Sequence, residues 1–350
     1  MSPGATSNRL RPTRGVRSDA SLGTGLRGAA AGALRRYTPS GIASRAGRSR
    51  FPLAAPSWPE SIPRPPEERD LGIDYDTSWS RKYPVRLARA VLLDNVTRPL
   101  AHLVASPEIR GDDHLVGVEG PVIFASNHLS HVDTPLLLSC LPLRFRHRTV
   151  VAAAADYFFD RRWKADLSSF ALAAFPIDRS KVNRRSAELA ADLLEDGWNL
   201  VFFPVGGRSP DGWGQEFHGG AAYLSSRTGR PVVPVHLDGT RHILPKGGGT
   251  LRRTKTTITF GVPIVPDEGE NARRFSARIE SAVAVLADEA TTDWWTARRQ
   301  AARGETPALQ GPDVAPWRRA WALPVRDDGP GDGADGGGRN TWPRRSGSGR

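Results

Sequence analysis

Short apolar runs alternate with segments of helical spacing through the middle of this chain. The runs have the length and residue types of buried strands, and two of the segments between them end at a glycine, as helices often do. Strands separated by helices predict an α/β fold with a largely parallel central sheet flanked by helices. The predicted strands are 120–127, 149–154, 198–205 and 231–239, with a strand end at 175–179, and the predicted helices are 134–141, 183–197 and 219–229.

The two ends of the chain lack this periodicity. Residues 1–83 are predicted to be a disordered basic and Pro-rich tail and linker, and residues 301–350 a low-complexity disordered tail, which leaves 84–300 as the folded domain. No run of 18 apolar residues is present, which argues against a spanning helix. Residues 84–106 mix Leu and Val with Arg, which indicates one or two helices that lie on a membrane interface or cover the core.

Charge and cysteine content restrict the function. Of the net charge of +12, most comes from residues 1–50, which hold ten arginines and one acidic residue. The basic excess therefore lies in the predicted tail, which weakens a nucleic-acid-binding interpretation. Cys140 is the single cysteine, so an intrachain disulfide and a two-cysteine metal motif are excluded, and a reducing cytoplasm is the expected setting.

His128 and Asp133 form an H-x4-D motif directly after a predicted strand. On a continuous helix, five residues would place the two side chains about 140° apart. Ser130 with Asp133 has the form of a capping box and Pro135 suits a first turn, so the helix is predicted to begin near Asp133, after His128. The carboxylate could then orient one imidazole nitrogen while the other faces a substrate hydroxyl. The alternative is that Asp133 only caps a helix and His128 is an ordinary loop histidine.

Two arginines also follow predicted strands. Arg179 and Arg208 come after apolar runs, and the carboxyl ends of parallel strands meet at one crevice. A guanidinium binds phosphate through two parallel hydrogen bonds. Gly206 and Gly207 permit close approach of a phosphate to the backbone, although a tight turn would need glycine equally.

Four sequence blocks appear in a characteristic order, N-H-L-S-H-V-D at 127–133, F-P-I-D-R at 175–179, F-P-V-G-G-R-S at 203–209 and V-V-P-V at 232–235. With them, residues 85–290 resemble the glycerolipid acyltransferases, which comprise the 1-acylglycerol-3-phosphate acyltransferases and their relatives. The resemblance implies transfer of a fatty acyl group from an acyl-coenzyme A or acyl-carrier-protein thioester to a hydroxyl of lysophosphatidate or a related phospholipid precursor. It implies His128 as general base and Asp133 as its orienting partner, without a metal or bound cofactor. The implied substrate-binding residues are Arg179, Gly206, Gly207, Arg208 and Ser209.

One position departs from the family pattern. Val205 stands where the family has a glutamate, which leaves the acceptor open and puts activity in question; if the change is a simple loss, Val205→Glu should raise activity. Glu216 is the nearest downstream acid.

Two further segments each have two interpretations. The block at 232–235 is either a core strand or the lining of an acyl channel. Residues 316–326 are either a small aromatic anchor or part of the disordered tail.

Three functions of different classes follow from these features. The first is an active acyltransferase, for lysophosphatidate or another lipid acceptor, and the intact His128 and Asp133 favour it. The second is a catalytically silent lipid-binding protein of the same fold, and the third a nucleic-acid-binding protein. The expected partners of the enzyme are an acyl thioester donor on coenzyme A or acyl carrier protein, a lysophospholipid and a membrane surface, without nucleic acid. The expected location is cytoplasmic, peripheral on the inner face of the cell membrane.

Overall fold

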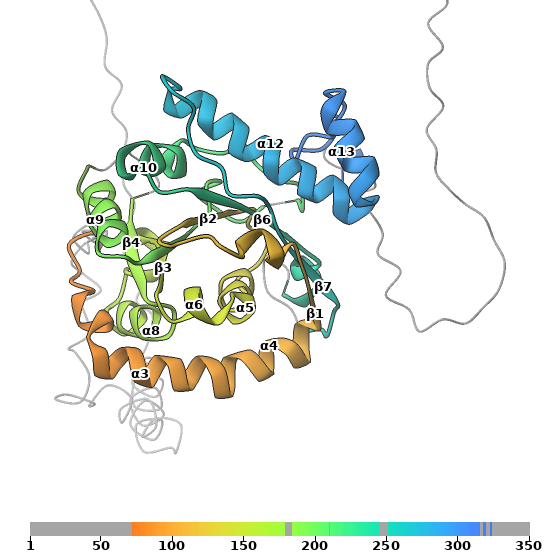
Figure 1. Ribbon diagram of the computed structural model, residues 1–350. Coiled ribbons are helices and arrows are strands. Elements are labelled where there is room, and N and C mark those ends of the chain that lie inside the picture. Colours follow the sequence, from red (N-terminus) through yellow and green to blue (C-terminus); the bar gives the residue numbers. More distant parts are fainter. Residues whose placement is uncertain are drawn as a thin grey trace, which may run out of the picture. The chain divides into compact units, whose positions relative to one another are not determined.

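The structure is a computed structural model that describes residues 72–178, 184–209, 211–244, 251–315, 318–319 and 323 (Figure 1). The predicted disorder of 1–71 and 324–350 concerns residues outside this set and stays a prediction. The same holds for most of the predicted aromatic anchor at 316–326.

A seven-stranded sheet forms the centre of the fold. Its order is β1-β7-β6-β2-β5-β3-β4, and every neighbouring pair is parallel except β6 and β7. The predicted α/β fold with a largely parallel sheet is therefore confirmed. The strands are β1 Pro107–Arg110, β2 Ile123–Ser126, β3 Thr149–Ala154, β4 Ala174–Ile177, β5 Asn199–Phe202, β6 Val232–Asp238 and β7 Thr256–Phe260.

Helices cover both faces of the sheet, as Figure 1 shows. Successive residues of a strand point to opposite faces, so Ile123 of β2 packs in one apolar cluster and Phe124 in the other. The Ile123 side is covered by α9 Arg184–Glu195, α10 Gly220–Thr228 and α12 Ala272–Thr291, and the Phe124 side by α4 Arg98–Ala105, α5 Asp133–Cys140 and α6 Leu143–Arg146. The remaining α-helices of the described residues are α3 Tyr83–Leu92, α7 Ala155–Phe158, α8 Arg162–Leu172, α11 Thr240–Ile243 and α13 Trp294–Ala302.

The predicted helical segment 84–106 consists of α3 and α4 joined by a π-helical turn, Leu93–Thr97. The turn precedes Pro99, which has no N–H to continue the α-helical hydrogen bonds. Leu93 and Ala105 are buried in the cluster that contains Phe124, so the segment covers the core. Its outer side carries six apolar side chains that are 54–73% exposed, here named the apolar face: Tyr83, Leu87, Val91, Val96, Leu100 and Leu103.

Membrane-spanning character can be judged for the described residues. Among them, each helix is either too short or too polar to cross a bilayer.

The described fold extends past the predicted bounds of 84 and 300. Before residue 84, a 3₁₀-helix, Ser78–Arg81, is held by the buried side chain of Arg89, whose Nη1 donates to the Ser80 carbonyl over 2.9 Å. After residue 300, the Leu309 carbonyl accepts the Gly214 N–H over 2.8 Å. On composition alone, both segments belong to the tails. Composition carries no information on single long-range hydrogen bonds such as these.

Candidate active site

One hollow of about 580 Å³ lies at the carboxyl ends of four strands. These strands, β2, β5, β3 and β4, are neighbours in the sheet, so the segments that follow β2, β5 and β3 reach the same space, together with the end of β4. This is the edge of a parallel sheet at which ligands usually bind. The lining polar and aromatic residues are His128, His131, Thr134, Tyr157, Phe158, Phe203, Arg208 and Gln215.

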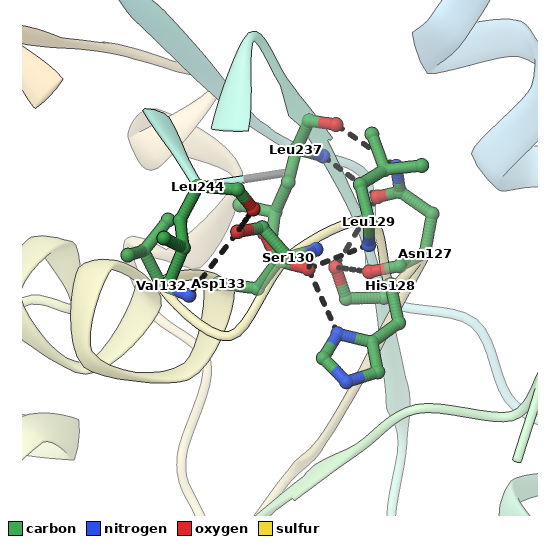
Figure 2. A network of polar contacts seen from close by, with 9 residues as sticks. Asn127, His128, Leu129, Ser130, Val132, Asp133, Leu237 and Leu244 are labelled. Atoms are coloured by element: carbon green, nitrogen blue, oxygen red, sulfur yellow. Dashed lines mark hydrogen bonds and ion pairs between the residues drawn. The ribbon is translucent and has the colours of Figure 1, made fainter. Parts of the chain in front are cut away.

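The predicted pair of His128 and Asp133 is formed. Nδ1 of His128 lies 2.8 Å from Oδ2 of Asp133, and Figure 2 shows the second ring nitrogen pointing away from this network. α5 begins at Asp133, as predicted, which leaves His128 in the preceding loop and free to fold back. The His128 side chain is 17% exposed and that of Asp133 is fully buried.

Asp133 also fixes the loop that carries His128. Its Oδ2 accepts the backbone N–H groups of Leu129 over 2.6 Å and of Ser130 over 2.8 Å. An ionised carboxylate only accepts hydrogen bonds, so the proton between the two side chains belongs on Nδ1 of His128. In that tautomer Nε2 carries no hydrogen, and its lone pair is available to a ligand in the hollow that His128 lines. Among the described residues, none bonds Oδ1 of Asp133.

The predicted capping box is only half present. The carboxylate of Asp133 reaches the Ser130 N–H, but the Ser130 hydroxyl makes no cap to the helix. It donates instead to the Leu244 carbonyl over 2.9 Å. Ser130 thereby ties the loop that carries His128 to the segment that follows α11.

Two contacts from the loop after β5 hold His128 from the other side. The ring of Phe203 stacks on the imidazole, with centroids 4.3 Å apart. The Ser209 N–H donates to the His128 carbonyl over 3.0 Å. Sequence reasoning missed the role of Phe203, although it stands in the third block directly before Pro204.

Asn127 fixes the end of β2 against β6. Its side-chain amide donates to the Leu237 carbonyl and accepts the Leu237 N–H, each over 2.8 Å. The position of the loop is therefore set from within the sheet, one residue before His128 (Figure 2).

The predicted substrate-binding residues fall into three groups. Gly206, Gly207 and Arg208 line the hollow, and Gly206 has a φ of 65°, which explains glycine at that turn. Ser209 is buried, and its hydroxyl accepts the Gly212 N–H over 2.7 Å, so it shapes the loop. Arg179 lies outside the described residues, and its role stays a prediction.

The unusual position Val205 faces the protein core. Its side chain is 5% exposed and belongs to the same cluster as Phe217 and Leu224. Glu216 is exposed and does not line the hollow. The hollow therefore receives no carboxylate from either of these positions.

The fourth block is a core strand. Val232, Val233 and Val235 of β6 are completely buried, and none of them lines the hollow. Of the two interpretations, the structure places this block in the sheet core.

A second histidine lies in the hollow. Nε2 of His131 is 3.1 Å from the hydroxyl oxygen of Tyr157 in α7, and the two rings stack with centroids 5.4 Å apart. Burial, followed by the positive charge of Arg208, lowers the pKa of His131. His131 stands within the first sequence block, but nothing in the sequence connects it with Tyr157.

A metal site was not expected. Within the part of the chain that the structure describes, no three His, Cys, Asp or Glu residues are grouped so as to hold a metal ion. That the reaction needs no metal and no bound cofactor stays a prediction.

Comparison with known proteins gives one family. Residues 106–238 match the protein-family model described as Acyltransferase. The chain is 28% identical over 188 residues to a chloroplastic 1-acyl-sn-glycerol-3-phosphate acyltransferase of Brassica napus, covering 50% of this chain and 53% of that protein. It is 30% identical over 158 residues to a chloroplastic 1-acyl-sn-glycerol-3-phosphate acyltransferase of Arabidopsis thaliana, covering 45% of this chain and 43% of that protein.

A solved structure is also similar. The crystal structure of the 1-acyl-sn-glycerophosphate acyltransferase PlsC from Thermotoga maritima aligns at 22% identity with a TM-score of 0.46, covering 62% of this chain and 87% of that chain. The chain spans about half the length of the two curated plant relatives that it matches.

Proposed function

Because residues 106–238 match the family model described as Acyltransferase, we propose that this protein transfers a fatty acyl group from a thioester of coenzyme A or acyl carrier protein. The proposed acceptor is a free hydroxyl of lysophosphatidate or a related phospholipid precursor. The observation that carries the proposal is the 2.8 Å contact of His128 with buried Asp133 at the edge of a hollow. The names of the two plant relatives support the same reaction class.

His128 acts as the general base. Its Nε2 takes the proton of the acceptor hydroxyl while the hydroxyl oxygen forms a bond to the thioester carbonyl carbon. The carbon–sulfur bond then breaks, and the proton held on His128 passes to the departing thiolate. Base catalysis of this kind raises the rate by a factor of about 10² to 10⁴. Positioning of the two substrates adds to it, and together these effects suffice because a thioester is already activated.

Asp133 keeps His128 in the reactive tautomer. The carboxylate stabilises the imidazolium that forms when Nε2 accepts a proton. Because Asp133 is fully buried, its charge is little screened by water, and its attraction for the imidazolium is correspondingly stronger than at the surface. The stacked ring of Phe203 limits rotation of the imidazole.

Arg208 binds the acceptor phosphate in this proposal. It lines the hollow together with Gly206 and Gly207, and its planar guanidinium matches the geometry of a phosphate. Arg179, two residues after β4 ends, is proposed as a second phosphate ligand because β4 contributes to the same hollow.

The apolar face of α3 and α4 supports association of the protein with a membrane surface. Six large apolar side chains are exposed there. In the sequence Lys82 directly precedes them and Arg98 lies among them, and their positive charge attracts anionic lipid. We place the protein peripherally on the membrane that holds its lysophospholipid acceptor.

Thiol release from oleoyl-coenzyme A tests the proposal. Purified protein should release thiol only when lysophosphatidate is present, and His128→Ala should abolish this release. His147→Ala is a matched control, because His147 also contacts an aspartate, Asp94, over 2.9 Å but does not line the hollow. Turnover retained by His128→Ala would remove His128 from the mechanism. Lysophosphatidate binding without release from coenzyme A or carrier-protein donors would support the silent lipid-binding alternative.

A further inference from the structure

His131 and Tyr157 come from two segments that sequence alone does not bring together. His131 follows β2, and Tyr157 lies in α7 directly after β3. In the sheet, β5 separates these strands, and the loop after β5 carries Arg208 into the same hollow. The two side chains nevertheless meet, with Nε2 of His131 3.1 Å from the Tyr157 hydroxyl oxygen.

The tyrosine ring is held on several sides. Its centroid lies 5.4 Å from the His131 ring in a stacked arrangement and 4.9 Å from the Phe158 ring in an edge-on one. The Lys164 ammonium lies 5.5 Å from the centroid of the same ring. Tyr157 is still 44% exposed, so it is oriented without being covered.

The hydroxyl of Tyr157 has bonding capacity beyond its contact with His131. A tyrosine hydroxyl donates one hydrogen bond and accepts others. When Nε2 of His131 carries the proton and donates to the tyrosine oxygen, the hydroxyl hydrogen is available to a ligand in the hollow. Arg208 lines the same hollow as Tyr157 and His131, which is the geometric basis for placing one bound anion between the guanidinium and the tyrosine hydroxyl.

We propose that Tyr157, positioned by His131, donates a hydrogen bond to a phosphate oxygen of the acceptor that Arg208 binds. Tyr157 is thus a specificity-determining residue, and His131 is a positioning residue that acts through it. The pair selects acceptors that carry a phosphate monoester over uncharged glycerides. This inference rests on the proposed acyl transfer to a phosphorylated acceptor.

Selectivity between two acceptors is the test. Tyr157→Phe keeps the ring and removes only the hydroxyl. Loss of one hydrogen bond to a charged group costs about a factor of ten in affinity, so KM for lysophosphatidate should rise about tenfold with little change in kcat. Activity on monoacylglycerol, which has no phosphate, should stay constant. Tyr223→Phe is the matched control, since Tyr223 is also 44% exposed but lies on α10 outside the hollow.

Two substitutions test the positioning role of His131. His131→Gln retains a donor at the end of a side chain of similar reach and should keep most of the selectivity, whereas His131→Leu should match Tyr157→Phe. Adding Tyr157→Phe to His131→Leu should cause little further loss. Full additivity of the two substitutions, or an equal fall on both acceptors, would overturn the proposed pair.

A binding measurement separates this inference from the reaction itself. Lysophosphatidate affinity can be measured by calorimetry on His128→Ala protein without an acyl donor, so that no turnover accompanies binding. Weaker binding after adding Tyr157→Phe supports the pair, and unchanged binding overturns it. Absence of thiol release from wild-type protein counts against the proposed enzyme only.

Discussion

The ring of Phe203 lies against the ring of His128 at an interplanar angle of 25°, with centroids 4.3 Å apart. The residues are far apart in the sequence and meet because β2 and β5 are neighbours in the sheet. Asp133 fixes the imidazole at Nδ1, and Phe203 covers one of its faces. A hydrogen bond at one atom leaves the ring free to turn, so the stacked phenyl ring supplies the missing restraint.

Phe203→Leu should therefore slow the chemical step. Leucine retains apolar bulk but not the flat stacking surface, so we expect kcat to fall about tenfold through loss of alignment with a small change in the melting temperature. Steady-state thiol release and thermal unfolding, measured on the same preparations, check this. An unchanged kcat would show that Asp133 alone orients His128.

Val205→Glu should destabilise the protein and not restore a lost activity. The side chain is 5% exposed in an apolar cluster, and an uncompensated buried charge costs on the order of 3–5 kcal/mol. This expectation replaces the one drawn from the family pattern alone. Denaturant unfolding measures the loss, with Val262→Glu as control because Val262 is 55% exposed. A variant as stable as wild type and more active would show that this loop turns toward the hollow.

Asp288→Asn should stabilise the protein at neutral pH. Asp288 is 6% exposed, none of the described residues bonds its Oδ2, and burial raises its pKa above 3.8. The folded state therefore binds the proton more tightly than the unfolded state. Ionisation of Asp288 destabilises the folded state, and this destabilisation grows as pH rises from 3.8 through the raised pKa.

The measurement is the melting temperature of both proteins between pH 3 and pH 8. If the relieved cost is about 1 kcal/mol, the variant should melt about 2–4 °C higher at pH 7, and the difference should vanish near pH 3. Asp313→Asn, at an exposed acid, should leave the melting temperature unchanged. A variant that is less stable at pH 7 would indicate that the carboxylate has a bonding partner in solution.

The double variant Leu87→Glu/Leu100→Glu should weaken membrane binding. Both leucines lie on the apolar face and are 54% and 55% exposed. Burial of one leucine contributes about 1.5–3 kcal/mol, so sedimentation with phosphatidylglycerol vesicles should show at least a tenfold loss of affinity. Val262→Glu/Val265→Glu, two equally exposed valines outside this face, should bind vesicles like wild type. Equal loss in both double variants would indicate a general charge effect.

The parts of the fold that are encoded locally could be predicted from the sequence. β2, β3, β5 and β6 are strongly apolar runs, because parallel strands covered on both faces contact helices at every residue. β7 and β1 were not predicted: β7 reads T-T-I-T-F, and β1 has a single large apolar residue, Ile109. The long helix α12 was also missed, although Asn271 caps it by accepting the Arg274 N–H over 2.9 Å.

The candidate site divides in the same way. The H-x4-D pair lies within six consecutive residues, so strand, turn and helix start together placed His128 against Asp133 and predicted the contact. The buried position of Ser209 did not follow from its block, because the sequence does not distinguish a buried serine hydroxyl from an exposed one. Only the folded loop shows that it accepts the Gly212 N–H.

What the sequence by itself determined was the fold class, the start of α5 and the contact between His128 and Asp133, all of which depend on residues close together in the chain. The tertiary structure decided which other side chains share the hollow. Phe203 reaches His128 because β5 pairs with β2, and Tyr157 reaches His131 because β3 pairs with β5. The order of strands in a sheet follows from the packing of the whole chain, and no local pattern of residues records it.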